Sequence, residues 1–100
     1  MWFPVIVWAV SLAATLAPNK QTIYTLPTIH KDVPISVYVQ GVDRGDVDCY
    51  LLVNHRIVAS DESNNNYCDI RYTPNNNDLI KLWIVNRGDV ATQYQATVRQ

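Results

Sequence analysis

The residue types best suited to catalysis or metal binding in this chain of 100 residues are two histidines and two cysteines. Catalysis by a histidine requires a nucleophile beside it and an acid that orients its ring. No serine or cysteine stands in a recognisable nucleophile context in the sequence, although His30 and His55 are both candidates for a base. We therefore predict no catalytic residues and no enzyme activity, and we interpret both histidines as surface or turn residues.

Cys49 and Cys68 each lie in a run of alternating apolar residues and are predicted to face the same interior. A bridge between them would close a loop of roughly 18 residues and stabilise the fold by about 3 kcal/mol. An oxidising compartment favours this disulfide, and two buried free thiols are the alternative. A metal site is not predicted, because no second cysteine pair or neighbouring histidine motif accompanies them.

Acidic side chains gather around two of the predicted loops. Carboxylate oxygens are the ligands that Ca²⁺ prefers, and the ion takes roughly six to eight oxygen ligands in all. The spacing does not match an EF-hand loop, so ordinary loop carboxylates that accept turn N–H groups are the favoured interpretation. No cofactor or metal is predicted, and the residues kept as calcium candidates are Asp46, Asp48, Asp61 and Asp69.

Strands must position these residues. From Gln21 onward apolar residues alternate with polar ones at a period of two, and β-branched and aromatic types dominate the runs. Breaks that contain glycine, proline or asparagine separate them. The pattern predicts an all-β domain, a small jelly-roll or Ig-like antiparallel β-sandwich of about seven strands. The strands are expected near residues 22–26, 34–40, 47–53, 56–60, 67–72, 79–86 and 93–99.

The alternation also divides each strand into two faces. If the cysteines and the residues in step with them point inward, several large apolar side chains project to the opposite side. Exposed aromatic residues that gather on one surface mark contact sites, and tryptophan is enriched among residues that dominate binding energies. The alternative is that this face packs on another sheet, or that the assignment is reversed. The binding-face candidates are Tyr38, Tyr50, Leu52, Trp83 and Val85.

The first 18 residues carry no charge and are mostly apolar. As a helix they would span roughly 27 Å, close to the thickness of the hydrocarbon core of a bilayer. An uncleaved membrane anchor is one interpretation, and the interface-type aromatics Trp2, Phe3 and Trp8 favour it. A signal peptide cleaved after Ala13 or Ala17 is the second, although no basic residue precedes the run. A buried core helix is a third, which we favour least. Either of the first two interpretations predicts a membrane-associated or secreted, extracytoplasmic protein.

The chain is divided accordingly. Residues 1–18 are predicted to form a hydrophobic helix that serves as signal or anchor. Residues 19–33 are expected to form a linker and the first strand, and residues 34–100 the β-sandwich. The formal net charge is −1, from eight basic and nine acidic residues spread along the chain. Because no basic stripe exists, nucleic acid is not a predicted partner.

A series of short motifs follows the strand order: an Asp-x-Asp-x-Tyr strand, an Ala-Ser-Asp turn, a Thr-Pro loop and an Asn-x-Gly ending. Over about residues 34–99 this series resembles the bacterial pre-peptidase C-terminal domain. The segment Leu82-Trp83-Ile84 departs from that family, in which a Gly-Thr-Tyr segment is common. The resemblance implies a small jelly-roll-like sandwich of secreted proteins that assists substrate binding or secretion and is not catalytic. The matching residues are Asp46, Asp48, Tyr50, Ala59, Ser60, Asp61, Thr73, Pro74, Asn86 and Gly88, with Tyr94 and Val98 on the last strand.

Together these observations predict a non-catalytic binding or structural module that is membrane-anchored or exported. Residues 1–18 would contact the membrane. The outward face would meet a protein partner or the neighbours in an assembly such as an envelope or a virion-like particle. The alternative is a cleaved, secreted accessory domain that binds a polymer or a protein. A small hydrolase or inhibitor is a third hypothesis, which no motif supports.

Overall fold

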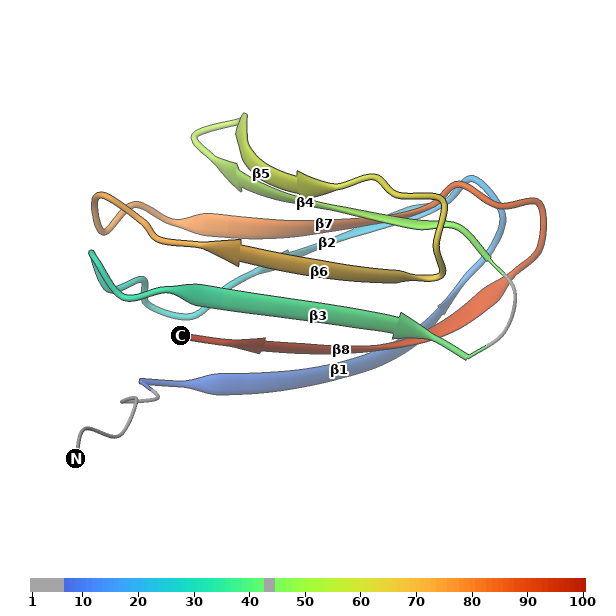
Figure 1. Ribbon diagram of the computed structural model, residues 1–100, viewed down its shortest axis with the longest axis horizontal. Helices are drawn as coiled ribbons and strands as arrows, with labels where there is room; N and C mark the ends of the chain where they lie inside the picture. Colours follow the sequence, from blue (N-terminus) through green and yellow to red (C-terminus); the bar gives the residue numbers. More distant parts are fainter. Residues whose placement is uncertain (1–6, 43–44) are drawn as a thin grey trace.

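The computed structural model describes residues 7–42 and 45–100, which form two antiparallel β-sheets packed face to face (Figure 1). These residues contain strands and connecting loops, and no helix. The strands are β1 (Ala9–Leu16), β2 (Gln21–Thr25), β3 (Ile35–Gly41), β4 (Val47–Val53), β5 (Arg56–Asp61), β6 (Tyr67–Tyr72), β7 (Ile80–Asn86) and β8 (Thr92–Arg99).

Each sheet has four strands, in the order β1-β8-β3-β6 in one sheet and β2-β7-β4-β5 in the other. The antiparallel pairs β1–β8, β2–β7, β3–β6 and β4–β5 are nested, as in one long hairpin that has folded over into two layers. This is the arrangement of a jelly roll. The predicted all-β sandwich is confirmed, with eight strands in place of about seven, and each predicted strand end falls within one residue of the ends of β2 to β8.

The core lies between the two sheets and is built by the residues predicted to point inward. Alternation at a period of two places one side of every strand against the other sheet, where burial removes apolar surface from water. Val53 and Tyr72 lie at strand ends and are only partly buried against the core. The inward residues that are buried are Ile35, Val37, Val39, Cys49, Leu51, Cys68, Ile70, Ile80, Leu82, Ile84, Tyr94, Ala96 and Val98.

The predicted N-terminal hydrophobic helix is wrong for the described part of residues 1–18. Ala9–Leu16 is strand β1, and it pairs with β8 in continuous antiparallel register. An uncharged apolar run fits a helix and a strand alike, but Val10 and Leu12 alternate with small residues and pack against the core. The edge of β8 can be paired only by another strand. Pairing with β8 therefore decides the conformation of this segment.

Residues 7–42 and 45–100 contain no helix that is long and apolar enough to span a membrane. Residues 1–6, which include the predicted interface aromatics Trp2 and Phe3, lie outside the described part of the chain. Trp8 is described, and its indole N–H donates to the carbonyl of Thr28 at 2.8 Å. Trp8 therefore packs against the sandwich itself.

A disulfide joins the two sheets. Cys49 in β4 and Cys68 in β6 are bonded to each other, and both side chains are fully buried. The chain has two cysteines, and neither is free. The predicted disulfide is confirmed, and the alternative of two buried thiols is wrong.

A buried asparagine ties together two connections at one end of the sandwich. Asn86 is the last residue of β7 and has no exposed surface. Its Nδ2 donates to the carbonyl oxygens of Leu16, Ala17 and Val90 at 3.0, 3.3 and 2.8 Å. Its Oδ1 accepts the N–H of Gly88 at 2.9 Å. These contacts hold the β1–β2 connection against the β7–β8 connection.

Candidate binding face

The outer face of the sheet β2-β7-β4-β5 carries apolar side chains in register across its four strands. Ile23 of β2 lies opposite Trp83 of β7, which lies opposite Tyr50 of β4. In the neighbouring row Leu52 of β4 lies opposite Ile57 of β5. Residues directly opposite each other share a face of the sheet, so these side chains form one surface. We define the Trp83 face as the outward apolar residues Ile23, Tyr50, Leu52, Ile57, Leu79, Trp83 and Val85.

Exposure is graded across the Trp83 face. Ile23, Ile57 and Leu79 have 54%, 54% and 56% of their surface exposed. Trp83 is half-buried at the centre, and Tyr50 is buried beside it. A single exposed apolar residue is ordinary on a protein surface, whereas several on one side of one sheet mark a contact surface.

Trp83 is fixed in place by two contacts. Its ring lies 4.7 Å from that of Tyr50, centroid to centroid, with the planes tilted by 34°. Its indole N–H donates to Oε1 of Gln21 at 2.9 Å. Offset aromatic pairs at this separation are favourable beyond the area that they bury. The centre of the Trp83 face is therefore a preorganised aromatic pair.

A shallow hollow lies beside this pair. It has a volume of about 220 Å³ and is lined by the apolar side chains of Ile23, Leu52 and Leu79. His55 and Lys81 form part of its polar margin. His55 belongs to the turn between β4 and β5, where it has a positive φ of 66°. The hollow thus combines an apolar floor with a polar and cationic edge, as is typical of a contact site.

A small polar network borders the other side of Tyr50. The Tyr50 hydroxyl donates to Oε2 of Glu62 at 3.2 Å and accepts from Nη2 of Arg87 at 3.4 Å. The Arg87 guanidinium also pairs with Asp48, with 3.4 Å between Nε and Oδ2. Burial, together with the nearby charge of Asp46, raises the pKa of Asp48, and Arg87 opposes this shift. This network orients Tyr50 under Trp83.

The structure places only some of the predicted binding-face residues on one surface. Tyr50, Leu52, Trp83 and Val85 share the outer face of one sheet, with Tyr50 and Val85 each only 4% exposed. Tyr38 lies in β3 of the other sheet, where it is 46% exposed and its ring stacks on Tyr67 at 6.3 Å. It therefore faces the opposite side of the molecule from the other four.

Three exposed members of the Trp83 face were not identified from the sequence. Ile23 and Ile57 lie in short strands, and Leu79 lies just before β7, so none shows a long alternating pattern. The signal that finds them is the pairing register, which places Ile23 beside Trp83 and Ile57 beside Leu52. That register depends on contacts between distant segments.

The carboxylates of two of the four calcium candidates, Asp61 and Asp48, bond to other groups of the protein. Asp61 accepts the N–H of Asp69 at 2.9 Å, and it accepts the N–H and hydroxyl of Ser63 at 3.1 and 2.7 Å. Asp48 pairs with Arg87. Within residues 7–42 and 45–100 no group of three or more histidine, cysteine, aspartate or glutamate side chains is placed to hold a metal ion.

The hydrogen bonds to Asp61 make stability depend on pH. Burial raises the pKa of this carboxyl, but the groups of Asp69 and Ser63 that donate to it outweigh burial and lower the pKa below its usual value. A depressed pKa in the folded state means that the stabilisation is present above about pH 4 and is lost as the pH falls further. Asp61→Ala should therefore lower the free energy of unfolding by about 1–2 kcal/mol at neutral pH, and by progressively less in acid.

Urea denaturation at a series of pH values checks this prediction. Asp69→Ala is the matched control, because it keeps the backbone N–H that Asp61 accepts and changes only an exposed side chain. We expect it to alter stability by less than about 0.5 kcal/mol. An Asp61→Ala penalty that does not shrink in acid would contradict the assignment.

Trp83→Ala should destabilise the fold by about 2 kcal/mol, because it removes a half-buried ring from Tyr50. Trp83→Phe keeps an aromatic ring and loses only the exposed hydrogen bond to Gln21, so its cost should stay below about 1 kcal/mol. Thermal and urea denaturation measure both. Equal losses in the two variants would show that the indole hydrogen bond, and not the aromatic pair, holds this face.

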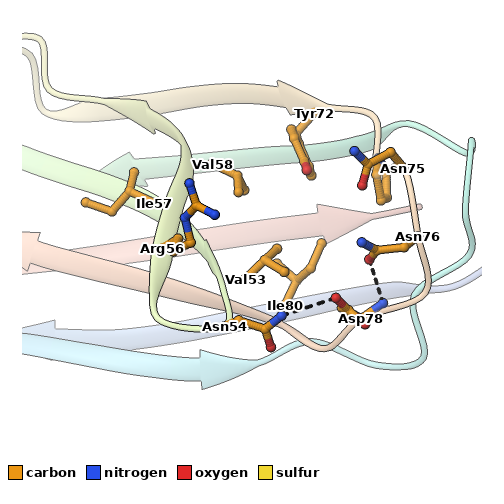
Figure 2. A pocket seen from close by; sticks show the side chains of 11 residues that line it. Val53, Asn54, Arg56, Ile57, Val58, Tyr72, Asn75, Asn76, Asp78 and Ile80 are labelled. Atoms are coloured by element: carbon orange, nitrogen blue, oxygen red, sulfur yellow. Dashed lines mark hydrogen bonds between the residues drawn. The ribbon is translucent and has the colours of Figure 1, made fainter.

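A second hollow, of about 350 Å³, lies between the β4–β5 hairpin and the loop from β6 to β7 (Figure 2). On its polar side Asn54 Nδ2 donates to Oδ2 of Asp78 at 3.2 Å, and the Asp78 N–H donates to Oδ1 of Asn76 at 2.9 Å (Figure 2). These polar groups bond to one another, so we interpret the hollow as the open end of the core. Its apolar side is formed by Val53, Val58, Tyr72 and Ile80.

No protein-family model and no curated protein sequence matches this chain. Its fold is nevertheless similar to that of solved structures. One is the pre-peptidase C-terminal domain of a collagenase from Bacillus anthracis, with a TM-score of 0.68 and 14% identity, covering 89% of this chain and 87% of that one. The predicted resemblance is confirmed as a likeness of fold.

Two further structures share the architecture. PliG from Aeromonas hydrophila, a periplasmic inhibitor of g-type lysozyme, has a TM-score of 0.64 and 10% identity, and the match covers 92% of this chain and 86% of that one. PirA has a TM-score of 0.59 and 14% identity, with 90% and 93% covered. At such identities the likeness concerns the fold alone.

Proposed function

We propose that this protein is a non-catalytic, extracytoplasmic binding module whose Trp83 face contacts a protein partner. The observation that carries the proposal is that three exposed apolar side chains, Ile23, Ile57 and Leu79, share one face of the sheet with the Trp83–Tyr50 pair. Contact surfaces are built in this way, with large aromatic residues at the centre and polar groups at the margin.

The extracytoplasmic location is supported by the disulfide and by the neighbours in fold. A buried disulfide forms and persists in oxidising compartments. The structures of similar fold include a periplasmic lysozyme inhibitor and the pre-peptidase C-terminal domain of a collagenase. A binding role agrees with both. Membrane association, and a place in an envelope or virion-like assembly, remain predictions from the sequence.

A protein partner is favoured over a polymer by the chemistry of the face. The exposed side chains are aliphatic and carry no hydrogen-bonding groups, so they favour a partner that buries apolar surface of its own. The charged margin, with Lys81 on one side and Glu62 and Arg87 on the other, can supply specificity. A secreted accessory domain that binds a polymer is the alternative that the experiment distinguishes.

The test purifies the tagged protein from its own cells together with any molecule that associates with it in a fixed ratio. Two double variants are compared. Ile23→Asp/Ile57→Asp places two carboxylates on the Trp83 face. Tyr38→Asp/Tyr67→Asp is the matched control, since these aromatic residues are similarly exposed, at 46% and 40%, on the outer face of the other sheet. All four positions are exposed, so we expect both variants to remain folded, and thermal unfolding verifies this.

We expect a protein that accompanies the wild type to be lost at least about tenfold from the Ile23→Asp/Ile57→Asp variant and retained by the control. Retention by the first variant together with loss from the control would place the binding surface on the other sheet. Association with a polysaccharide in place of a protein would contradict the proposed class of partner.

A further inference from the structure

Within residues 7–42 and 45–100 four strands lie at sheet edges, and three of them carry features that prevent pairing with another chain. β2 is only five residues long and follows Lys20. β5 begins with Arg56 and ends with Asp61, and its pairing with β4 is interrupted by a bulge. β6 carries Asp69 and Arg71. Short length, bulges and charges are the usual protections of an exposed sheet edge.

β1 has none of these protections. Its eight residues include no charge and no proline, and its register with β8 is continuous from end to end. β1 runs along one edge of the fold in Figure 1, and among the described residues only β8 pairs with it. Every second residue of an edge strand directs its N–H and C=O away from the sheet. β1 therefore presents a row of backbone donors and acceptors that no other described strand pairs with.

The side chains of β1 also suit a closely packed partner strand. On the core side, Val10 and Leu12 are only partly buried because none of the described strands lies beyond β1 in the sheet. On the outer side, Ser11 and Ala13 are small and lie opposite Thr97 and Gln95 of β8. A further strand next to β1 would complete the burial of the apolar pair without steric obstruction.

We propose that β1 pairs antiparallel with β1 of a second copy of this chain. The two four-stranded sheets would then form one continuous sheet of eight strands, with β1 and its counterpart at the centre. The occupant is a second copy because antiparallel pairing about a twofold axis brings two uncharged strands together, with no like-charge repulsion between them. This interface is distinct from the Trp83 face.

The test is the oligomeric state of the full-length protein, measured by light scattering over a concentration series. The wild type should have twice the mass of one chain. Ser11→Lys and Ser11→Glu each place like charges near the twofold axis and should weaken dimerisation at least about tenfold. An equimolar mixture of the two variants should restore the dimer, because opposite charges then meet.

Thr97→Lys is the matched control. Thr97 lies opposite Ser11 on the same face, but one strand further from the edge, so this variant should remain dimeric. Thermal unfolding verifies that each variant is folded, and Ala13→Lys substitutes for Ser11→Lys if the latter is not. A monomeric wild type, a dimeric Ser11→Lys variant, or a mixture that stays monomeric would each overturn the proposal.

Discussion

Replacing Cys49 and Cys68 together by alanine is expected to lower the free energy of unfolding by about 3 kcal/mol. The disulfide joins residues 19 positions apart and connects β4 in one sheet to β6 in the other. A covalent link of this length removes conformational freedom from the unfolded chain, and the gain is about 3 kcal/mol for a loop of about 20 residues. In a domain of this size such a loss is a large part of the total stability.

Urea denaturation of the wild type and the Cys49→Ala/Cys68→Ala variant measures this effect, with and without reductant. Reductant should destabilise the wild type by a similar amount and leave the variant unchanged. A loss below about 1 kcal/mol in the variant, or a wild type that reductant does not affect, would contradict the role assigned to the bridge.

Asn86→Asp is expected to be the most damaging single polar substitution, at about 3–5 kcal/mol near neutral pH. The amide nitrogen donates to three backbone carbonyl oxygens, and replacing it by a carboxylate oxygen directs negative charge at all three. A fully buried charge is costly even with the Gly88 N–H as a donor, and the three carbonyls also lose their hydrogen bonds. Asn86→Ala, which only removes the bonds, should cost about 2–3 kcal/mol.

Urea denaturation at two pH values separates the contributions to this loss. The penalty of Asn86→Asp should shrink toward that of Asn86→Ala in acid, where the carboxyl carries a proton and no charge. Asn75→Asp is the matched control, because Asn75 is exposed in a loop and the change should stay within about 0.5 kcal/mol. An Asn86→Asp variant as stable as the control would show that this residue does not join the two connections.

Local patterns predicted most of the strands and the disulfide. Alternation at a period of two, as in Ile35, Val37 and Val39, reflects a strand with one buried side, and this requires no knowledge of its partners. Cys49 and Cys68 each follow this alternation, which placed both thiols in the same core. Turn residues then marked the strand ends to within one residue.

Two features could not be predicted, because they depend on which strands pair. Residues 9–16 have no charges, so a helix and a strand are equally compatible with them, and the open edge of β8 decides between the two. Alternation also predicts that Tyr38 and Trp83 point away from the core, but it does not predict that β3 and β7 belong to different sheets. For the same reason Ile23 and Ile57 could be assigned to the Trp83 face only from their register with Trp83 and Leu52.

Site-specific photocrosslinking tests most directly whether the Trp83 face is the binding surface. A benzophenone amino acid in place of Ile57 samples contacts at this face, and the same residue in place of Tyr67 samples the outer face of the other sheet. Irradiation in the native cells should join the chain labelled at position 57 to a different protein, and the chain labelled at position 67 should give no such product. A crosslinked partner obtained only from position 67 would contradict the proposed function.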